Sequence, residues 1–237
     1  MSRTASATPD DALPDRGLSL EAWLARLERQ HPVAIDLGLE RVAVVAERLG
    51  LTESPLAGAL ITVAGTNGKG STVAMLEALA GAHGRSTAAY TSPHLLRYNE
   101  RLRLDGREAD DGLLVAGFER VEAARLMSEP VSLTYFEVGT LAALWAIAQR
   151  RPEVAILEVG LGGRLDAVNV VDSDVAVVTS VALDHADFLG TDLEAIGREK
   201  AGILRGSRPA VLGHDLPGSV FAAAEACGAQ AWRLGRD

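Results

Sequence analysis

The residues with the clearest chemical potential lie between positions 60 and 72, where an apolar run leads into glycines, a lysine and two hydroxyl side chains. The run Leu60 to Ala64 has the length and composition of a buried parallel strand. Gly65 breaks it, and strong helix formers follow from Ser71, where we expect a helix to open. Such a turn presents free N–H groups and a positive helix end, and Lys69 adds a full charge. The pattern predicts a phosphate-binding loop.

This loop is a variant of the usual phosphate-binding pattern. That pattern has a glycine, four residues and then Gly-Lys-Ser/Thr, whereas here Gly70 separates Lys69 from Ser71, and Val63 stands where the first glycine would be. The alternative interpretation is a glycine-rich turn that binds nothing. Three glycines around a lysine have little packing purpose, so we prefer the phosphate site.

Two further candidates stand at the ends of predicted strands. Glu158 lies in the buried run 154–159, where a carboxylate is costly unless it is paired or binds a metal. Mg²⁺ with phosphate prefers such oxygen ligands. The alternative for Glu158 is a salt bridge to Arg164. His185 follows the run 174–181, and a histidine in that position is by itself more often structural.

Other polar residues carry weaker signals. Ser92 by itself indicates a turn before a proline, and Lys200 a solvated helical charge. Three arginines, Arg97, Arg101 and Arg103, either attract an anionic substrate to the phosphate site or face solvent on an edge hairpin. Their pattern does not distinguish the two interpretations.

The elements that position these residues alternate along the chain. Strands are expected over 60–64, 86–91, 154–159, 174–181, 209–212 and 230–234, and helices over 19–31, 39–49, 71–82, 110–127, 133–150, 193–204 and 217–227. This alternation predicts an α/β fold with a mostly parallel sheet and helices on both faces. Ligands of such sheets lie beyond the carboxyl ends of the strands, so Gly65, Ser92, Glu158 and His185 should gather at one edge.

Length and composition limit the function classes. The 237 residues suit one large α/β domain, with residues 1–17 a disordered tail and residues 18–237 the domain. A net charge of −9 argues against a nucleic-acid binder, and no apolar run is long enough for a membrane span or a signal peptide. The single cysteine, Cys227, excludes an internal disulfide and makes the cytosol the natural compartment. We expect Cys227 to be a small core residue.

Several segments together resemble a known family. Residues 65–72 are similar to the ATP loop of the Mur ligase superfamily, and the closer likeness is to bacterial folylpolyglutamate synthase/dihydrofolate synthases, from about residue 23 to 213. The other segments that carry it are Ile35 to Gly38, Tyr90-Thr-Ser-Pro-His-Leu95, Leu133-Thr-Tyr-Phe-Glu137, Leu157-Glu-Val-Gly-Leu-Gly-Gly-Arg-Leu-Asp166, Ala182-Leu-Asp-His185 and Gly197-Arg-Glu-Lys-Ala-Gly202.

The resemblance implies a P-loop-containing, ATP-dependent ligase of folate metabolism. ATP phosphorylates the carboxylate of dihydropteroate, or the γ-carboxylate of a tetrahydrofolate, and L-glutamate attacks the acyl phosphate. By this likeness the catalytic residues are Lys69, Glu158, His185 and Lys200, of which Lys200 is carbamylated. Two Mg²⁺ ions are bound by Ser92, Glu158 and His185. The likeness further assigns the ATP phosphates to Thr66, Asn67, Gly68, Lys69, Gly70 and Ser71, and the pterin to Thr134, Leu165 and Ala167.

One departure from the family concerns its second, C-terminal domain, which supplies contacts to adenine, ribose and glutamate. We expect that domain to be absent here, and the chain to be a monomer that binds nucleotide weakly and ligates poorly. Two alternatives stay open. One is another Mur-type ligase, which the 135–137 segment and the Ser-Pro-His loop disfavour, and the other is a nucleotide-binding module without catalysis.

Overall fold

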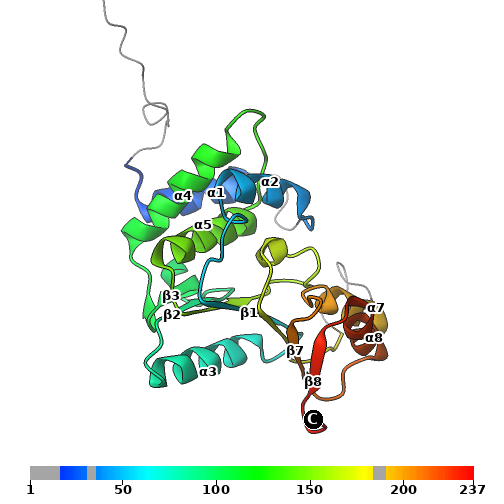
Figure 1. Cartoon of the computed structure of the whole chain (residues 1–237). Helices are drawn as coiled ribbons and strands as arrows, with labels where there is room; N and C mark the ends of the chain where they lie inside the picture. The colour runs from blue at the N-terminus through cyan, green and yellow to red at the C-terminus, as the bar shows by residue number, and fades with distance from the viewer. Residues whose placement is uncertain (1–16, 31–35, 184–190) are drawn as a thin grey trace, which may run out of the picture.

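An eight-stranded sheet forms the centre of the computed structural model, which describes residues 17–30, 36–183 and 191–237 (Figure 1). In spatial order its strands are β4 (Arg107–Glu108), β3 (Leu102–Leu104), β2 (Thr87–Tyr90), β5 (Val154–Glu158), β1 (Ala59–Ala64), β6 (Val175–Val178), β7 (Pro209–Leu212) and β8 (Gln230–Arg233). Strand β3 pairs antiparallel with both β2 and β4, and the other pairs are parallel. The predicted α/β fold with a mostly parallel sheet is confirmed.

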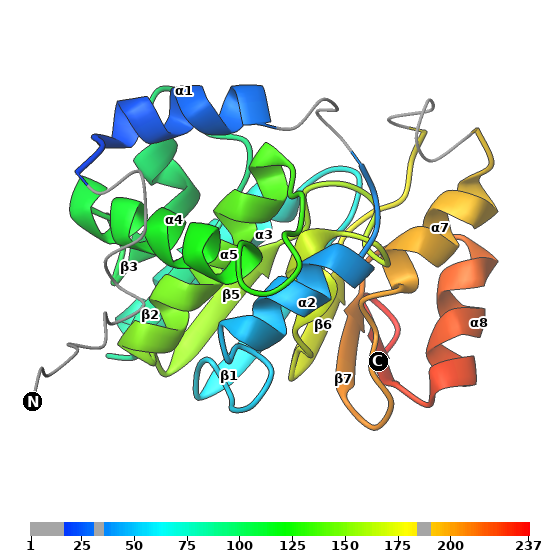
Figure 2. The same ribbon diagram turned by 90° about the horizontal axis from the view of Figure 1, so that it is seen from above.

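Helices cover both faces of this sheet. The helices are α1 (Leu20–Gln30), α2 (Glu40–Arg48), α3 (Lys69–Ala82), α4 (Asp111–Arg125), α5 (Tyr135–Arg150), α7 (Leu193–Ala201) and α8 (Gly218–Cys227), with short 3₁₀ turns η2 (Tyr98–Arg101) and η3 (Ala167–Val170). Figure 1 shows α3 on the face opposite to α1, α2, α4 and α5, and Figure 2 shows α7 and α8 beside β7. Within the described residues, none of these helices is long and apolar enough to cross a bilayer.

The core has two parts because the sheet separates them. The small part lies under α3 and consists of Val63, Val73, Ala89 and Ile156, all of them fully buried. The large part fills the space between the opposite face and the remaining helices. Strands β1 and β5 lie between the two parts, which explains why their sequences are nearly continuous apolar runs.

Two expectations about helices need correction. Helix α3 begins at Lys69, two residues before the predicted start at Ser71, because Gly68 takes the N-cap position with a φ of 84°. Cys227 is exposed as the last residue of α8, so its prediction as a core residue was wrong. The predicted tail lies outside the described residues, apart from Gly17.

Candidate functional site

The turn after β1 lies between the ends of β5 and β6, because β1 pairs with both strands. Gly65 has a φ of 153°, and a β-carbon there would collide with Thr179 Oγ1, so this position requires glycine. Gly68 caps α3 without a side-chain hydrogen bond. The first N–H groups of α3, at residues 69–71, are therefore available to an external acceptor such as phosphate.

The end of β6 anchors this loop. The Thr66 N–H donates to the Ser180 carbonyl at 2.8 Å, and the Asn67 N–H donates to Ser180 Oγ at 2.9 Å. The Thr179 hydroxyl donates to the Asn67 carbonyl at 2.7 Å. Thr66 and Asn67 thus use their N–H groups within the protein, and the contact of residues 66–71 with phosphate stays a prediction.

Glu158, the last residue of β5, faces the loop. A β-carbon at Gly70 would lie 3.7 Å from both carboxylate oxygens of Glu158. Glu158 is 6% exposed, and burial raises its pKa, while the Ser92 N–H and the Lys69 charge act in the opposite direction. The Lys69 ammonium group donates back to the Gly65 carbonyl at 3.0 Å. A buried carboxylate at the mouth of a phosphate loop is a donor suited to Mg²⁺.

The alternative partner for Glu158 is excluded by the structure. Arg164 forms its salt bridge with Glu199 at 2.8 Å, so the alternative interpretation of Glu158 as the partner of Arg164 was wrong. His185 lies outside the described residues, and its place beside Glu158 stays a prediction. Within the described ranges no three His, Cys, Asp or Glu side chains form a metal cluster. A cation at Glu158 therefore needs further oxygen donors, and the Ser92 hydroxyl is the predicted one.

A cavity of about 280 Å³ opens next to Glu158. Ser92 joins the two, because its N–H donates to Glu158 Oε2 at 3.3 Å and the residue also lines the cavity. Thr134, Leu165 and Ala167, the residues predicted to contact the pterin, line this same cavity. The structure thus brings together residues from three distant parts of the sequence beside the phosphate loop.

Asp166 is a cavity residue to which the sequence analysis gave no role. It is 2% exposed and accepts N–H bonds from Leu161 at 2.8 Å and Val168 at 3.0 Å. Burial raises the pKa of Asp166 to about 6. Its carboxyl group holds the turn after β5, and the residue lines the cavity. Its place in the Gly-Gly-Arg-Leu-Asp segment was the available signal.

Arg101 is the one of the three arginines in the 97–103 segment that lines the cavity. Its Nε donates to His94 Nδ1 at 2.9 Å, and its guanidinium group lies 5.2 Å from the centre of the Tyr98 ring. Arg97 pairs with a glutamate of β4, and Arg103 pairs with one of α3. The segment is thus an edge hairpin with one inward cation, and the attraction of an anionic substrate by Arg101 stays a prediction.

Lys200 lies in the last turn of α7 and is 4% exposed. Its backbone packs against Gly163, where a β-carbon would lie 3.0 Å from the Lys200 carbonyl oxygen. Lys200 is not among the residues that line the 280 Å³ cavity. Its burial contradicts the interpretation as a solvated helical charge.

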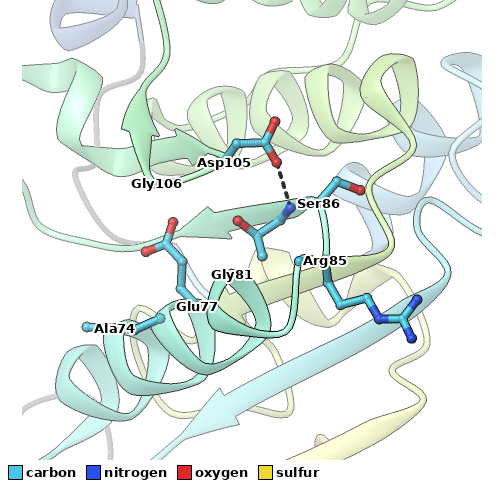
Figure 3. Close-up of a pocket in the computed structure, with 10 residues that line it drawn as sticks. Ala74, Glu77, Gly81, Arg85, Ser86, Asp105 and Gly106 are labelled. Carbon is cyan, nitrogen blue, oxygen red and sulfur yellow. Dashed lines mark hydrogen bonds between the residues drawn. The ribbon is translucent and has the colours of Figure 1, made fainter.

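A second cavity, of about 600 Å³, lies between α3 and the start of β2 (Figure 3). Its charged side chains are engaged within the protein. Asp105 accepts the Thr87 N–H at 2.9 Å, and Arg85 pairs with Glu153 at 2.6 Å. None of the predicted site residues that the structure describes lines this cavity, so we assign the candidate chemistry to the smaller cavity beside Glu158.

A helix-opening glycine loop, a buried carboxylate and an adjoining cavity at the carboxyl edge of a parallel sheet are the features expected of a phosphate-binding α/β domain. The Mur ligase middle domain family model matches residues 63–237. The chain belongs to this family.

Relatives and solved structures narrow the likeness. The chain is 52% identical over 230 residues to the dihydrofolate synthase/folylpolyglutamate synthase of Escherichia coli strain K12, with 96% of this chain and 52% of that protein covered. It matches a structure described as E. coli FolC in complex with DHPP and ADP with a TM-score of 0.90 and 51% identity, over 94% of this chain and 53% of that one. It also matches the structure of a bifunctional folylpolyglutamate synthase/dihydrofolate synthase with Mn, AMPPNP and L-glutamate bound. That match has a TM-score of 0.85 and 52% identity, and it covers 93% of this chain and 52% of that one. The chain spans about half the length of the curated relatives it matches.

Proposed function

We propose that this chain holds the ATP phosphates and the acid substrate of a ligase that joins L-glutamate to dihydropteroate and to the γ-carboxylate of folates. The observation that carries the proposal is the position of Ser92, which contacts the metal-binding candidate Glu158 and also lines the adjoining cavity. A carboxylate at that end of the cavity would face the phosphate loop. The similarity to dihydrofolate synthase/folylpolyglutamate synthases supports the same reaction.

In this proposal the loop holds the nucleotide. The N–H groups of residues 68–71 and the Lys69 ammonium group bind the phosphates. The segment after β6 keeps this loop in place through its hydrogen bonds with Thr66 and Asn67. Ser92, Glu158 and His185 would bind divalent cations, two Mg²⁺ ions in all. Mg²⁺ bound there supplies positive charge to the transferred phosphoryl group.

The acid substrate is placed in the cavity, with its ring system against Thr134, Leu165 and Ala167. Its carboxylate oxygen attacks the γ-phosphorus, the bond to the bridging oxygen breaks, and ADP leaves. The glutamate amine then attacks the acyl carbon, phosphate departs with the electron pair, and the amine loses a proton. The protein positions the reactants and stabilises charge, and no side chain acts as a nucleophile.

Lys200 has a separate place in the proposal. Carbamylation would convert its buried ammonium group to an anion, which suits a site that gathers cations. Mass spectrometry of the intact chain in bicarbonate tests this, since the carbamate adds a mass that acid treatment removes. The same spectrum for a Lys200→Ala variant should lack the adduct.

The deciding experiment titrates ATP with Mg²⁺ into the chain, with and without dihydropteroate, and follows ADP release. We expect dihydropteroate to strengthen binding or to start turnover, and Lys69→Met to abolish both effects. Nucleotide binding that ignores dihydropteroate would instead indicate the alternative, a nucleotide-binding module without catalysis. Binding of other Mur-type acids in place of dihydropteroate would indicate another ligase of the family.

A further inference from the structure

We propose that Arg41 is a positioning residue that holds the two walls of the 280 Å³ cavity together. Arg41 lies in α2 and does not itself line the cavity. It contacts Asp36 and Glu137, which line the cavity from two segments far apart in the sequence. We call these segments, residues 36–37 and 134–137, the two walls. The inference rests on the proposed function only for the identity of the acid that the cavity binds.

The contacts of Arg41 use all three guanidinium nitrogens. Its Nε donates to Glu137 Oε1 at 3.0 Å and to Oε2 at 3.1 Å, and Nη2 lies 2.8 Å from Glu137 Oε1. On the other side Nη1 lies 2.7 Å from Asp36 Oδ2, and Nη2 donates to the Asp36 carbonyl. One planar group therefore binds both a side chain and the backbone of the Asp36 segment.

Glu137 extends this link into the cavity wall. It is 3% exposed, and its Oε2 accepts the Thr134 N–H at 2.7 Å, while Thr134 Oγ1 accepts the Glu137 N–H at 3.2 Å. This reciprocal pair caps α5. Because Thr134 lines the cavity, a shift of Glu137 is transmitted to the surface that the substrate would contact. Arg41 thereby couples residues 36–37 to residues 134–137.

Position 41 requires an arginine, because the acceptors around it are several and lie in different directions. Glu137 is a buried carboxylate and needs a cation that stays paired. A lysine keeps the charge, but a single ammonium group cannot bind the two carboxylates and a carbonyl in the same arrangement. The substitution Arg41→Lys should therefore keep the charge and lose the link.

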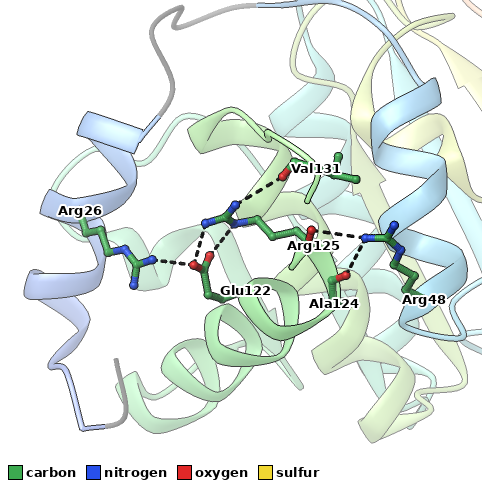
Figure 4. Close-up of polar contacts among 6 residues, drawn as sticks. All are labelled: Arg26, Arg48, Glu122, Ala124, Arg125 and Val131. Atoms are coloured by element: carbon green, nitrogen blue, oxygen red, sulfur yellow. Dashed lines mark hydrogen bonds and ion pairs between the residues drawn. The ribbon is translucent and has the colours of Figure 1, made fainter. Parts of the chain in front are cut away.

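Arg48 offers a matched control on the same helix. Its guanidinium group donates to the carbonyls of Ala124 at 3.0 Å, Arg125 at 3.3 Å and Glu129 at 3.1 Å. Figure 4 shows the Arg48 side chain reaching from α2 to backbone carbonyls at the end of α4. Arg48→Lys thus removes a comparable set of bonds from α2 without touching the cavity walls.

The test measures dihydropteroate and Mg²⁺–AMPPNP binding to the full chain by titration calorimetry. For Arg41→Lys we expect the Kd of dihydropteroate to rise about tenfold, because the walls lose their alignment, and the Kd of the nucleotide to stay within about twofold of the wild-type value. Arg48→Lys should leave both constants unchanged, although both variants lower Tm. Equal dihydropteroate affinity in the Arg41→Lys variant and the wild type would overturn the inference.

Hydrogen exchange followed by mass spectrometry separates this inference from the proposed function. In Arg41→Lys we expect faster exchange at residues 36–39 and also at 134–137, whereas Arg48→Lys should affect residues 124–131. If the wild type binds no dihydropteroate, the proposed acid is wrong, but faster exchange at both walls still supports the role of Arg41. If hydrogen exchange at either wall of the Arg41→Lys variant is as slow as in the wild type, the role of Arg41 is overturned.

Discussion

A β-carbon at position 70 would lie 3.7 Å from both carboxylate oxygens of Glu158. This separation is ordinary van der Waals contact, so alanine fits there without moving the backbone. The methyl group would nevertheless fill the space between the loop and the carboxylate, where a cation and a phosphate have to meet. Stability and ligand binding should therefore respond in opposite directions at this residue.

Gly70→Ala is expected to raise the free energy of unfolding by up to about 1 kcal/mol, because alanine favours the helix, while the Kd of Mg²⁺–AMPPNP rises at least about tenfold. Gly81→Ala is the control, since it lies in the same helix with nothing within 4 Å of its β-carbon. It should bring the stability gain alone. Urea unfolding and calorimetric titration measure the two effects, and undiminished nucleotide affinity in Gly70→Ala would contradict the assignment of the site.

Thr179→Val tests how β6 holds the loop. Valine has the shape of threonine but cannot donate to the Asn67 carbonyl, which the Thr179 hydroxyl does at 2.7 Å. We expect a loss of about 1 kcal/mol in unfolding free energy and weaker nucleotide binding, since the loop loses an anchor. Thr52→Val, in an exposed turn, should change neither. A variant with full nucleotide affinity would mean that the remaining bonds suffice to hold the loop.

Asp166 should make stability depend on pH. Its pKa in the folded chain is about 6 against an ordinary 3.8, because burial disfavours the charged form. The protonated group therefore stabilises the fold fully below about pH 4, and this contribution is lost as the pH rises through about 6, by about 3 kcal/mol at most. In urea unfolding from pH 4 to 7, the free energy of unfolding should fall more steeply for the wild type than for Asp166→Asn. Parallel curves for the two proteins would refute the raised pKa of Asp166.

Glu122 should be a structural residue with a large effect on stability. It is 2% exposed and binds Arg26 at 2.6 Å and Arg125 at 2.6 Å, which joins α1 to α4 (Figure 4). Glu122→Gln removes the buried negative charge that binds both guanidinium groups, so we expect a loss of about 3 kcal/mol in unfolding free energy. The exposed pair of Arg97 and Glu108 is the control. Glu108→Gln should lower the free energy of unfolding by less than about 1 kcal/mol, and urea unfolding measures both variants.

Much of the fold follows from local patterns in the sequence. The apolar runs at β1, β5 and β7 and the break at Gly65 could be recognised because buried strands and glycine turns have local signatures. The neighbours of β1 could not be predicted, since pairing with β6 joins residues more than 100 positions apart. For that reason the anchoring residues Thr179 and Ser180 were missed.

The candidate site shows the same division. Glu158 could be identified because a carboxylate in an apolar strand is conspicuous. Its closeness to Ser92 could also be expected, because both residues follow the ends of strands, and the Ser92 N–H does donate to Glu158. The partner of Arg164 could not be predicted, because its pairing with Glu199 depends on how α7 packs. The role of Asp166 depends on burial, which composition does not reveal. The carbamylation of Lys200 and the metal-binding role of His185 stay predictions.

The sheet order has a practical consequence for any study of this chain. The candidate site is formed by the ends of β2, β5, β1 and β6, which lie side by side in space but are spread over about half of the sequence. A fragment or a misfolded form that exchanged any two of these strands would separate the loop, the carboxylate and the cavity. Nucleotide affinity would thus serve as an assay for correct global topology, able to distinguish native chains from compact misfolded ones with the same secondary structure content.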